Sequence, residues 1–275
     1  YKLLLPGYIG YSSKEGSGIY DPVMEAGVHH AFYKVNRRLQ INIKDLEEKL
    51  DYPGKKVVLL VHYFGIPDIN YEKVIDICRK YDAVIIEDAA HALYTDFVDH
   101  CCGSKGDYTI YSLHKMLPFK TGGMLRINTL LGNEIFLHSE RNRVNIFDYD
   151  LYSISKVRKQ NAKMWDLLIC HSTFFPKVLE PLWQYSEDVT YQTYPVIVKD
   201  TCRDDLYFGL NKQNFGAVSL YHEMIKPIEK QGLEEALWLS EHILNLPVHQ
   251  DVNKTEIEKM FELLEKILKT REDIK

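Results

Sequence analysis

The stretch Val84–Ala92, "VIIEDAAHA", decides the fold class. Three apolar residues run directly into the acids Glu87 and Asp88, and small residues follow. A continuous apolar run is typical of a strand that is covered on both faces of its sheet. In open α/β sheets, ligands bind beyond the carboxyl ends of such strands. We therefore expect a buried strand that ends at a ligand site.

Similar apolar runs alternate with helix-like stretches over the first 130 residues. The strand-like runs are residues 1–6, 55–65, 83–88, 107–114 and 122–128, and the helix-like stretches are 45–51 and 70–82. This alternation of strands and helices predicts a mainly parallel sheet with helices on both faces, so the expected fold class is α/β.

The pattern changes from about Glu134 onward. A long amphipathic helix is expected over 153–172 and a closing helix over 253–272, with Thr255 as a candidate cap. Short strands are expected over 190–200, 216–225 and 242–250. These elements predict a smaller C-terminal α+β domain, which divides the chain into residues 1–133 and 134–275.

Composition limits the kind of protein. The 275 residues carry a net charge of -5, which argues against a nucleic-acid or acidic-membrane partner. The chain has no apolar run of the roughly 18 residues that span a bilayer and no signal-peptide pattern. Five scattered cysteines without a Cys-x-x-Cys pair are typical of a cytoplasmic protein, and Cys101 and Cys102 lack the second ligand cluster of a zinc site, so no metal is predicted. The chain begins at Tyr1 within an apolar run, so we expect that an N-terminal segment is absent.

Asp88 has two interpretations. An acid after a strand often caps the following helix, and on cap preferences alone this is the commoner role. The alternative is a carboxylate that holds a cationic ring nitrogen, since a carboxylate in a dry site stays charged only beside a positive partner.

Lys115 also has two interpretations. A single lysine in a loop is usually solvated. Here Ser112, whose hydroxyl can bind a phosphate, comes three residues before it, and Gly122 and Gly123, which permit close backbone approach, follow. A desolvated lysine amine beside a cationic cofactor has a lowered pKa and can form a Schiff base. Lys120 is the rival lysine, and the spacing from Ser112 favours Lys115.

The order "VHYFGIPD", "VIIEDAAHA", "GSKGDYTIYSLHK", "TGGML" resembles the DegT/DnrJ/EryC1/StrS family of sugar aminotransferases, which are pyridoxal phosphate enzymes of fold type I. The stretch "VRKQNAKMWDLL" is similar to the family's Arg-x-x-Asn-Ala helix, and "LPVHQDVNKTEIEKMFELL" to its closing strand and helix. The resemblance implies a fold type I PLP-transferase-like sheet with a smaller C-terminal domain, and a homodimer.

The resemblance also implies roles for single residues. Lys115 would be the Schiff-base lysine of pyridoxal 5'-phosphate and would carry the proton. Asp88 would pair with the pyridine nitrogen, His91 would lie near the phenolic oxygen, and Ser112 would bind the phosphate. A helix-surface position is the alternative for His91. Weaker candidates for lining the substrate pocket are His62, Tyr63 and Tyr8, for which a core position is at least as good an interpretation.

Several positions depart from the family pattern. Ser112 and Lys115 are closer together than in the family, and Thr121 stands in place of its acid. The aromatic residue that stacks on the cofactor ring falls on Gly10, with Tyr8 or Tyr11 as substitutes. The Ser-Gly-Thr phosphate loop would precede Tyr1, and the family's Asn that reaches the neighbouring subunit's phosphate has no assignable counterpart.

Three functions follow from these observations. The first is a transaminase that moves an amino group from an amino acid donor, with glutamate expected, to a keto sugar carried on a nucleotide. The second is a dehydratase of the same family, in which His replaces the lysine; Lys115 speaks against it, although His114 lies beside it. The third is a protein that keeps the fold, has lost catalysis and acts by binding.

Overall fold

The structure is a computed structural model that describes residues 1–129, 145–199, 203–218 and 220–272. The expected domain boundary between residues 133 and 134 lies outside the described residues, as does Cys202.

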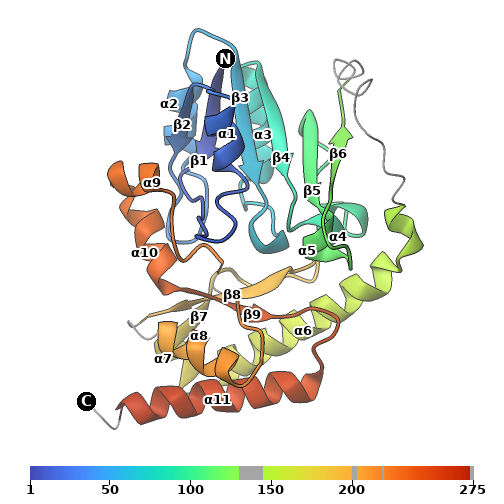
Figure 1. Ribbon diagram of the computed structural model, residues 1–275, viewed down its shortest axis with the longest axis vertical. Helices are drawn as coiled ribbons and strands as arrows, with labels where there is room; N and C mark the ends of the chain where they lie inside the picture. The colour runs from blue at the N-terminus through green and yellow to red at the C-terminus, as the bar shows by residue number, and fades with distance from the viewer. Residues whose placement is uncertain (130–144, 200–202, 219, 273–275) are drawn as a thin grey trace.

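A six-stranded sheet forms the first part of the molecule (Figure 1). Its strands lie in the order β2-β1-β3-β4-β5-β6, and all neighbours are parallel except β5 and β6. This confirms the mainly parallel α/β sheet. The bounds are β1 Lys2–Pro6, β2 His30–Tyr33, β3 Lys56–Val61, β4 Ala83–Asp88, β5 Tyr108–Ser112 and β6 Gly123–Ile127.

Short helices connect these strands, and α2 and α3 each bury one apolar side. Helix α3 packs on β4, and α2 packs on β2. Their buried residues recur at three- and four-residue spacing, as in an amphipathic helix. In Figure 1, α1 lies on the viewer's side of the sheet and α3 lies behind it. The bounds are α1 Tyr20–Glu25, α2 Ile43–Leu50, the 3-10 turn η1 Tyr63–Gly65, α3 Tyr71–Lys80, α4 Leu93–Phe97 and α5 Leu113–Met116.

The second part contains a three-stranded antiparallel sheet in the order β7-β8-β9, with long helices beneath it in Figure 1. A second apolar cluster lies here, around the fully buried Trp165. Buried residues of α9 and α10 instead join the apolar cluster of the large sheet. The bounds are η3 Ile146–Asp148, α6 Leu151–His171, α7 Phe175–Val178, β7 Leu179–Pro181, β8 Thr193–Val198, α8 Arg203–Lys212, α9 Lys226–Lys230, α10 Glu234–His242, β9 Ile243–Pro247 and α11 Lys254–Glu272.

Two local expectations are wrong. The described residues of 216–225 form isolated bridges, Val218 with Asn245 and Met224 with Gly10, and no strand. The cap of α11 is not Thr255. The Asn253 side chain accepts from the Glu256 N–H at 3.0 Å and the Glu256 side chain accepts from the Asn253 N–H at 2.9 Å, a capping box whose cap residue precedes Thr255 in the chain.

Within the described ranges, none of the helices combines the length and the apolar character that crossing a membrane requires. In this fold a ligand site is expected at one edge of the large sheet. Strands β3, β4 and β5 are parallel, so their carboxyl ends meet at the same edge. Because β6 returns antiparallel to β5, the connecting helix α5 lies at that edge too.

Candidate active site

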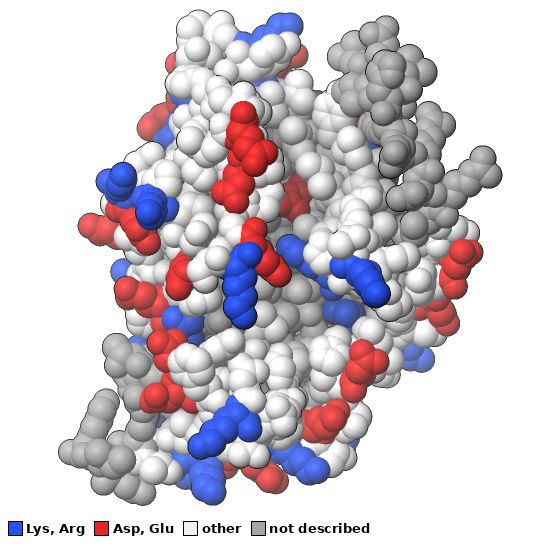
Figure 2. Space-filling view, viewed as in Figure 1, with Lys and Arg blue, Asp and Glu red and all other residues white. Residues whose placement is uncertain are grey.

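A cavity of about 550 Å³ opens at the carboxyl ends of β3, β4 and β5. Figure 2 shows this face of the molecule hollowed near its middle, with basic and acidic side chains mixed around the hollow. The cavity brings together the residues that the sequence separates widely, because parallel strands end at a common edge. Its lining includes His62, Asp88, His91, Ser112, Lys115 and Tyr221.

Asp88 is the last residue of β4 and lies half-buried in the cavity wall. Its Oδ1 accepts the backbone N–H of Ala90 at 2.9 Å, an Asx-turn. The helix-cap interpretation is wrong, because α4 begins only at Leu93 and its N-cap residue is Ala92. Burial raises the pKa of Asp88, while the Ala90 N–H and the charge of Lys115 act to lower it. A cation placed against this carboxylate would therefore be stabilised and would keep it ionised.

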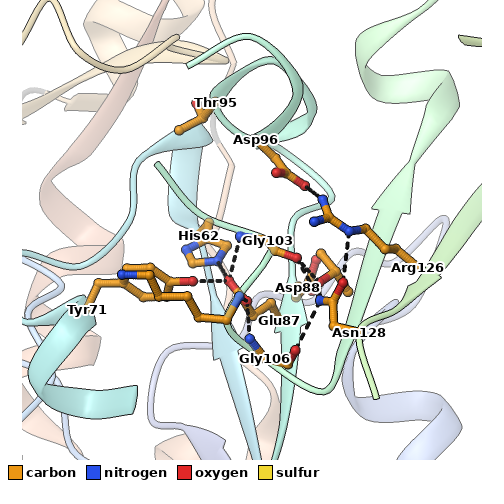
Figure 3. Close-up of polar contacts among 12 residues, drawn as sticks. His62, Tyr71, Glu87, Asp88, Thr95, Asp96, Gly103, Gly106, Arg126 and Asn128 are labelled. Carbon is orange, nitrogen blue, oxygen red and sulfur yellow. Dashed lines mark hydrogen bonds and ion pairs between the residues drawn. The ribbon is translucent and has the colours of Figure 1, made fainter. Parts of the chain in front are cut away.

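Glu87, the neighbour of Asp88, points to the opposite face of the sheet and is fully buried (Figure 3). Burial alone would raise its pKa, but hydrogen bonds and the charge of His62 outweigh burial and bring the pKa to about 2. Glu87 is therefore a buried, ionised anchor at the end of β4. Its donors are His62 Nε2 at 2.7 Å, the Tyr71 hydroxyl at 2.8 Å, and the backbone N–H groups of Gly103 at 2.8 Å, Lys105 at 3.1 Å and Gly106 at 2.6 Å.

The loop that donates to Glu87 is held from its other side as well (Figure 3). Asn128 Nδ2 donates to the carbonyls of Gly103 and Gly106, both at 3.0 Å. Arg126 joins Asn128 at 2.9 Å and the buried Asp96 at 2.8 Å. Polar networks that are satisfied on every side are rigid. The loop before β5 is thus fixed, and with it the register that carries Ser112 and α5 to the cavity.

Lys115 and His91 meet inside the cavity. Lys115 Nζ lies 3.4 Å from His91 Nε2. His91 is buried and its ring stacks on Phe64 with centroids 6.3 Å apart, so the helix-surface alternative for His91 is wrong. Burial, and then the charge of Lys115, lower the pKa of His91 to about 3, so its imidazole is neutral. Lys115 and the rival Lys120 are both exposed, but only Lys115 is among the cavity-lining residues.

Ser112 and His114 form the rim beside Lys115. The Ser112 hydroxyl oxygen lies 3.2 Å from His114 Nδ1, and that nitrogen lies 3.4 Å from the Gly122 carbonyl. Gly122 has a φ of +126°, a conformation that L side chains rarely adopt. The glycine therefore lets the chain turn back into β6 directly behind the rim.

Of the weaker candidates, only His62 lines the cavity. Tyr8 and Tyr63 are buried behind the wall. The Tyr63 hydroxyl donates to the Tyr8 carbonyl, and the Tyr8 hydroxyl donates to the Tyr221 carbonyl at 3.2 Å. Both tyrosines therefore support the wall, and the tyrosines that line the cavity are Tyr11, Tyr111 and Tyr221.

Tyr221 is a cavity residue that the sequence did not predict. It lies in a stretch expected to be a strand, and no motif marks it as a ligand-binding residue. Its placement depends on a contact with residues more than two hundred positions earlier, which the local pattern does not encode.

The chemistry of these side chains fits pyridoxal 5'-phosphate. A carboxylate suits the ring nitrogen, an amine suits the aldehyde, and a hydroxyl suits the phosphate. Nδ1 of the buried His62, a cavity-lining residue, has no hydrogen-bond partner among the described residues, although buried polar atoms are rarely left unpaired.

Comparisons with known proteins concern the family and the fold. Residues 19–130 match the family model described as the DegT/DnrJ/EryC1/StrS aminotransferase family. Over 261 residues the chain is 23% identical to a dTDP-4-amino-4,6-dideoxy-D-glucose transaminase of Shigella dysenteriae, covering 81% of this chain and 67% of that protein. It is 34% identical over 82 residues to the uncharacterized protein MJ1066 of Methanocaldococcus jannaschii, a match that spans 30% of this chain and only 21% of that protein.

Solved structures show the same fold. A DegT DnrJ EryC1 StrS aminotransferase from Brucella abortus superposes with a TM-score of 0.74 at 17% identity, covering 97% of this chain and 79% of that one. The GDP-4-keto-6-deoxy-D-mannose-3-dehydratase of E. coli superposes with a TM-score of 0.73 at 17% identity, covering 96% and 79%. Residues 19–130 are thus similar to the DegT/DnrJ/EryC1/StrS aminotransferase family, and the chain as a whole shares the fold of the solved structures.

Proposed function

We propose that this chain is a pyridoxal phosphate-dependent aminotransferase that transfers an amino group from an amino acid to a keto sugar. The observation that carries the proposal is the convergence of Asp88 and Lys115 on one cavity, with His91 3.4 Å from the lysine amine. The family match supports the same reaction class.

Each residue then has a chemical task. Pyridoxal phosphate, when bound, supplies a protonated pyridine ring that withdraws electrons from the substrate carbon. Asp88 would hold the ring nitrogen and, with its negative charge, would keep that nitrogen protonated. Lys115 would hold the cofactor at its aldehyde carbon, and its Nζ would take and return the proton. Neutral His91 offers a hydrogen bond to the phenolic oxygen, and Ser112 donates its hydroxyl to the phosphate.

The substrates, assembly and organisation are part of the proposal. A nucleotide-linked keto sugar as acceptor is supported by the printed name of the Shigella dysenteriae relative, and glutamate is proposed as the donor. We further propose a homodimer, a cytoplasmic location and a division into a large domain of residues 1–133 and a small domain of residues 134–275.

The proposal is tested by trapping the cofactor on its lysine. The protein is incubated with pyridoxal phosphate, reduced with borohydride and digested, and the peptides are weighed by mass spectrometry. The added mass is expected on the peptide that contains Lys115, and it is expected to disappear in Lys115→Ala but not in the matched control Lys120→Ala. An adduct that survives Lys115→Ala would refute the assignment.

A dehydratase is the second candidate. Two observations favour it: His114 lines the same cavity beside Lys115, and the E. coli dehydratase has the same fold. Incubation with ¹⁵N-glutamate and a nucleotide keto sugar separates the candidates. A transaminase adds ¹⁵N to the sugar, whereas a dehydratase lowers the mass of the sugar by one water. If the cofactor binds and neither product forms, the protein acts by binding alone.

A further inference from the structure

Two chain segments that are distant in sequence together form one wall of the cavity. The Tyr11 N–H donates to the Glu223 carbonyl at 2.9 Å, and the Ile225 N–H donates to the Ile9 carbonyl at 3.1 Å. Gly10 and Met224 form an antiparallel bridge between these bonds. The segment 221–225 is therefore fixed against residues 9–11 by backbone pairing.

Tyr221 presents its ring from this wall into the cavity. The ring is braced from behind by Tyr8 and Tyr63, with centroid distances of 5.3 and 5.5 Å. It meets the His91 ring edge-to-face at 6.2 Å. Burial and then the charge of Asp88 raise the pKa of Tyr221, so its phenol is neutral and lies within the field of that carboxylate.

The backbone at Tyr221 is unusual for a tyrosine. Its φ is +62°, in the left-handed region that non-glycine residues seldom occupy. Such conformations persist where the surroundings hold them, and they cluster at functional sites. The pairing with residues 9–11 supplies that restraint.

Gly10 explains why the ring fits. A Cβ atom on Gly10 would lie 2.7 Å from Tyr221 Cδ1, closer than a carbon atom can approach. Gly10 does not have a positive φ, so its backbone would accept a side chain. The Tyr221 ring therefore fills the space that a side chain at position 10 would occupy, and position 10 is where the family resemblance places an aromatic residue.

We propose that Tyr221 supplies the aromatic face against which the cofactor ring packs, in place of a side chain at position 10. The inference rests on the proposed function, because it needs a pyridine ring between Asp88 and Lys115. It assigns a binding residue that comes from the C-terminal half of the chain.

The test measures the affinity of the full chain, freed of cofactor, for pyridoxamine 5'-phosphate, which carries no aldehyde and cannot link to Lys115. Equilibrium dialysis gives the dissociation constant, and circular dichroism verifies that each variant is folded. Tyr221→Leu, which keeps apolar volume and removes the ring, is expected to weaken binding about two- to tenfold, the usual contribution of an aromatic pair. Tyr221→Phe is expected to stay within about twofold of the unmodified chain on the same reasoning.

Two further variants sharpen the result. Gly10→Ala places a methyl group against the ring and is expected to weaken binding in the same direction as Tyr221→Leu. Tyr152→Ala, a change at a 71% exposed tyrosine outside the cavity lining, is the matched control and is expected to bind normally. If the unmodified chain binds and Tyr221→Leu binds equally well, the role of Tyr221 is refuted while the proposed function stands. If the unmodified chain does not bind, the proposed function itself fails.

Discussion

Replacing Glu87 by glutamine tests whether a buried ionised carboxylate anchors the end of β4. Glutamine has nearly the same shape but lacks the charge and turns one acceptor oxygen into a donor NH₂ group. Oε2 of Glu87 faces three donors and Oε1 faces two. Whichever way the amide is turned, its NH₂ group meets at least two N–H or O–H donors and leaves them unsatisfied.

The magnitude follows from the pKa of Glu87. A pKa of about 2 in place of the usual 4.5 means that the folded state binds the ionised form more strongly than the unfolded state does. At roughly 1.4 kcal/mol per pKa unit, the charge contributes about 3 kcal/mol to the free energy of unfolding at pH 7. Because the pKa is lowered on folding, this stability is present above about pH 4.5 and is lost as the pH falls toward about 2.

The assay is urea unfolding followed by circular dichroism at pH 7 and pH 4. Glu87→Gln is expected to lower the free energy of unfolding by about 3 kcal/mol at pH 7. The difference in the free energy of unfolding between the two proteins is expected to narrow by about 1 kcal/mol at pH 4. There Glu87 takes up a proton in the unfolded state of the unmodified protein while it stays ionised in the folded state, and glutamine cannot take up a proton in either. The matched control is Glu48→Gln, at an exposed position of α2, with an expected change within about 0.5 kcal/mol. If the free energies of unfolding of Glu87→Gln and the unmodified protein differ by less than about 1 kcal/mol at pH 7, or if their difference does not change with pH, the Glu87 carboxylate is not the anchor described.

Two other substitutions probe the framework around the cavity. Gly65 has φ +92°, and a Cβ added there would lie only 2.5 Å from the Thr190 carbonyl oxygen. Gly65→Ala is therefore expected to lower the free energy of unfolding in urea by more than about 3 kcal/mol, against about 1 kcal/mol for Gly27→Ala, where φ is +60° and the space is open. Equal losses in the two variants would contradict the clash. In Asn161→Ala, three carbonyls lose the Nδ2 donor that joins α6 to the chain before α11. The free energy of unfolding is expected to fall by about 2 kcal/mol, and it is expected to stay unchanged in Gln160→Ala, at the exposed neighbouring position. If Asn161→Ala is as stable as the unmodified protein, water replaces the donor.

The large sheet could be predicted because its signals are local. The apolar run that ends at Asp88 becomes β4, although its residues alternate between buried and partly buried, and the strands beside it follow from the same pattern. The meeting of Asp88, His91, Ser112 and Lys115 follows from topology, since parallel strands bring their carboxyl ends to one edge.

The remainder could not be predicted because it depends on partners that are distant in the chain. Glu87 is next to Asp88 in the sequence, but strand alternation turns its side chain to the other face of the sheet, where it accepts hydrogen bonds from His62 and from a loop. The stretch that holds Tyr221 has the alternation of a strand, yet the neighbour it needs is supplied by residues 9–11. Alternation reports which face is apolar and does not say which segment will pair with it.

The pairing of residues 9–11 with 221–225 also determines when the cavity can form during synthesis. Tyr8 and Tyr221 lie 213 positions apart, and the ribosome releases the chain from its N-terminal end. The nascent sheet must therefore wait, with Tyr8 and Ile9 uncovered, until the second segment emerges, although both are fully buried in the finished protein. During that interval the growing chain is most open to capture by chaperones and to aggregation.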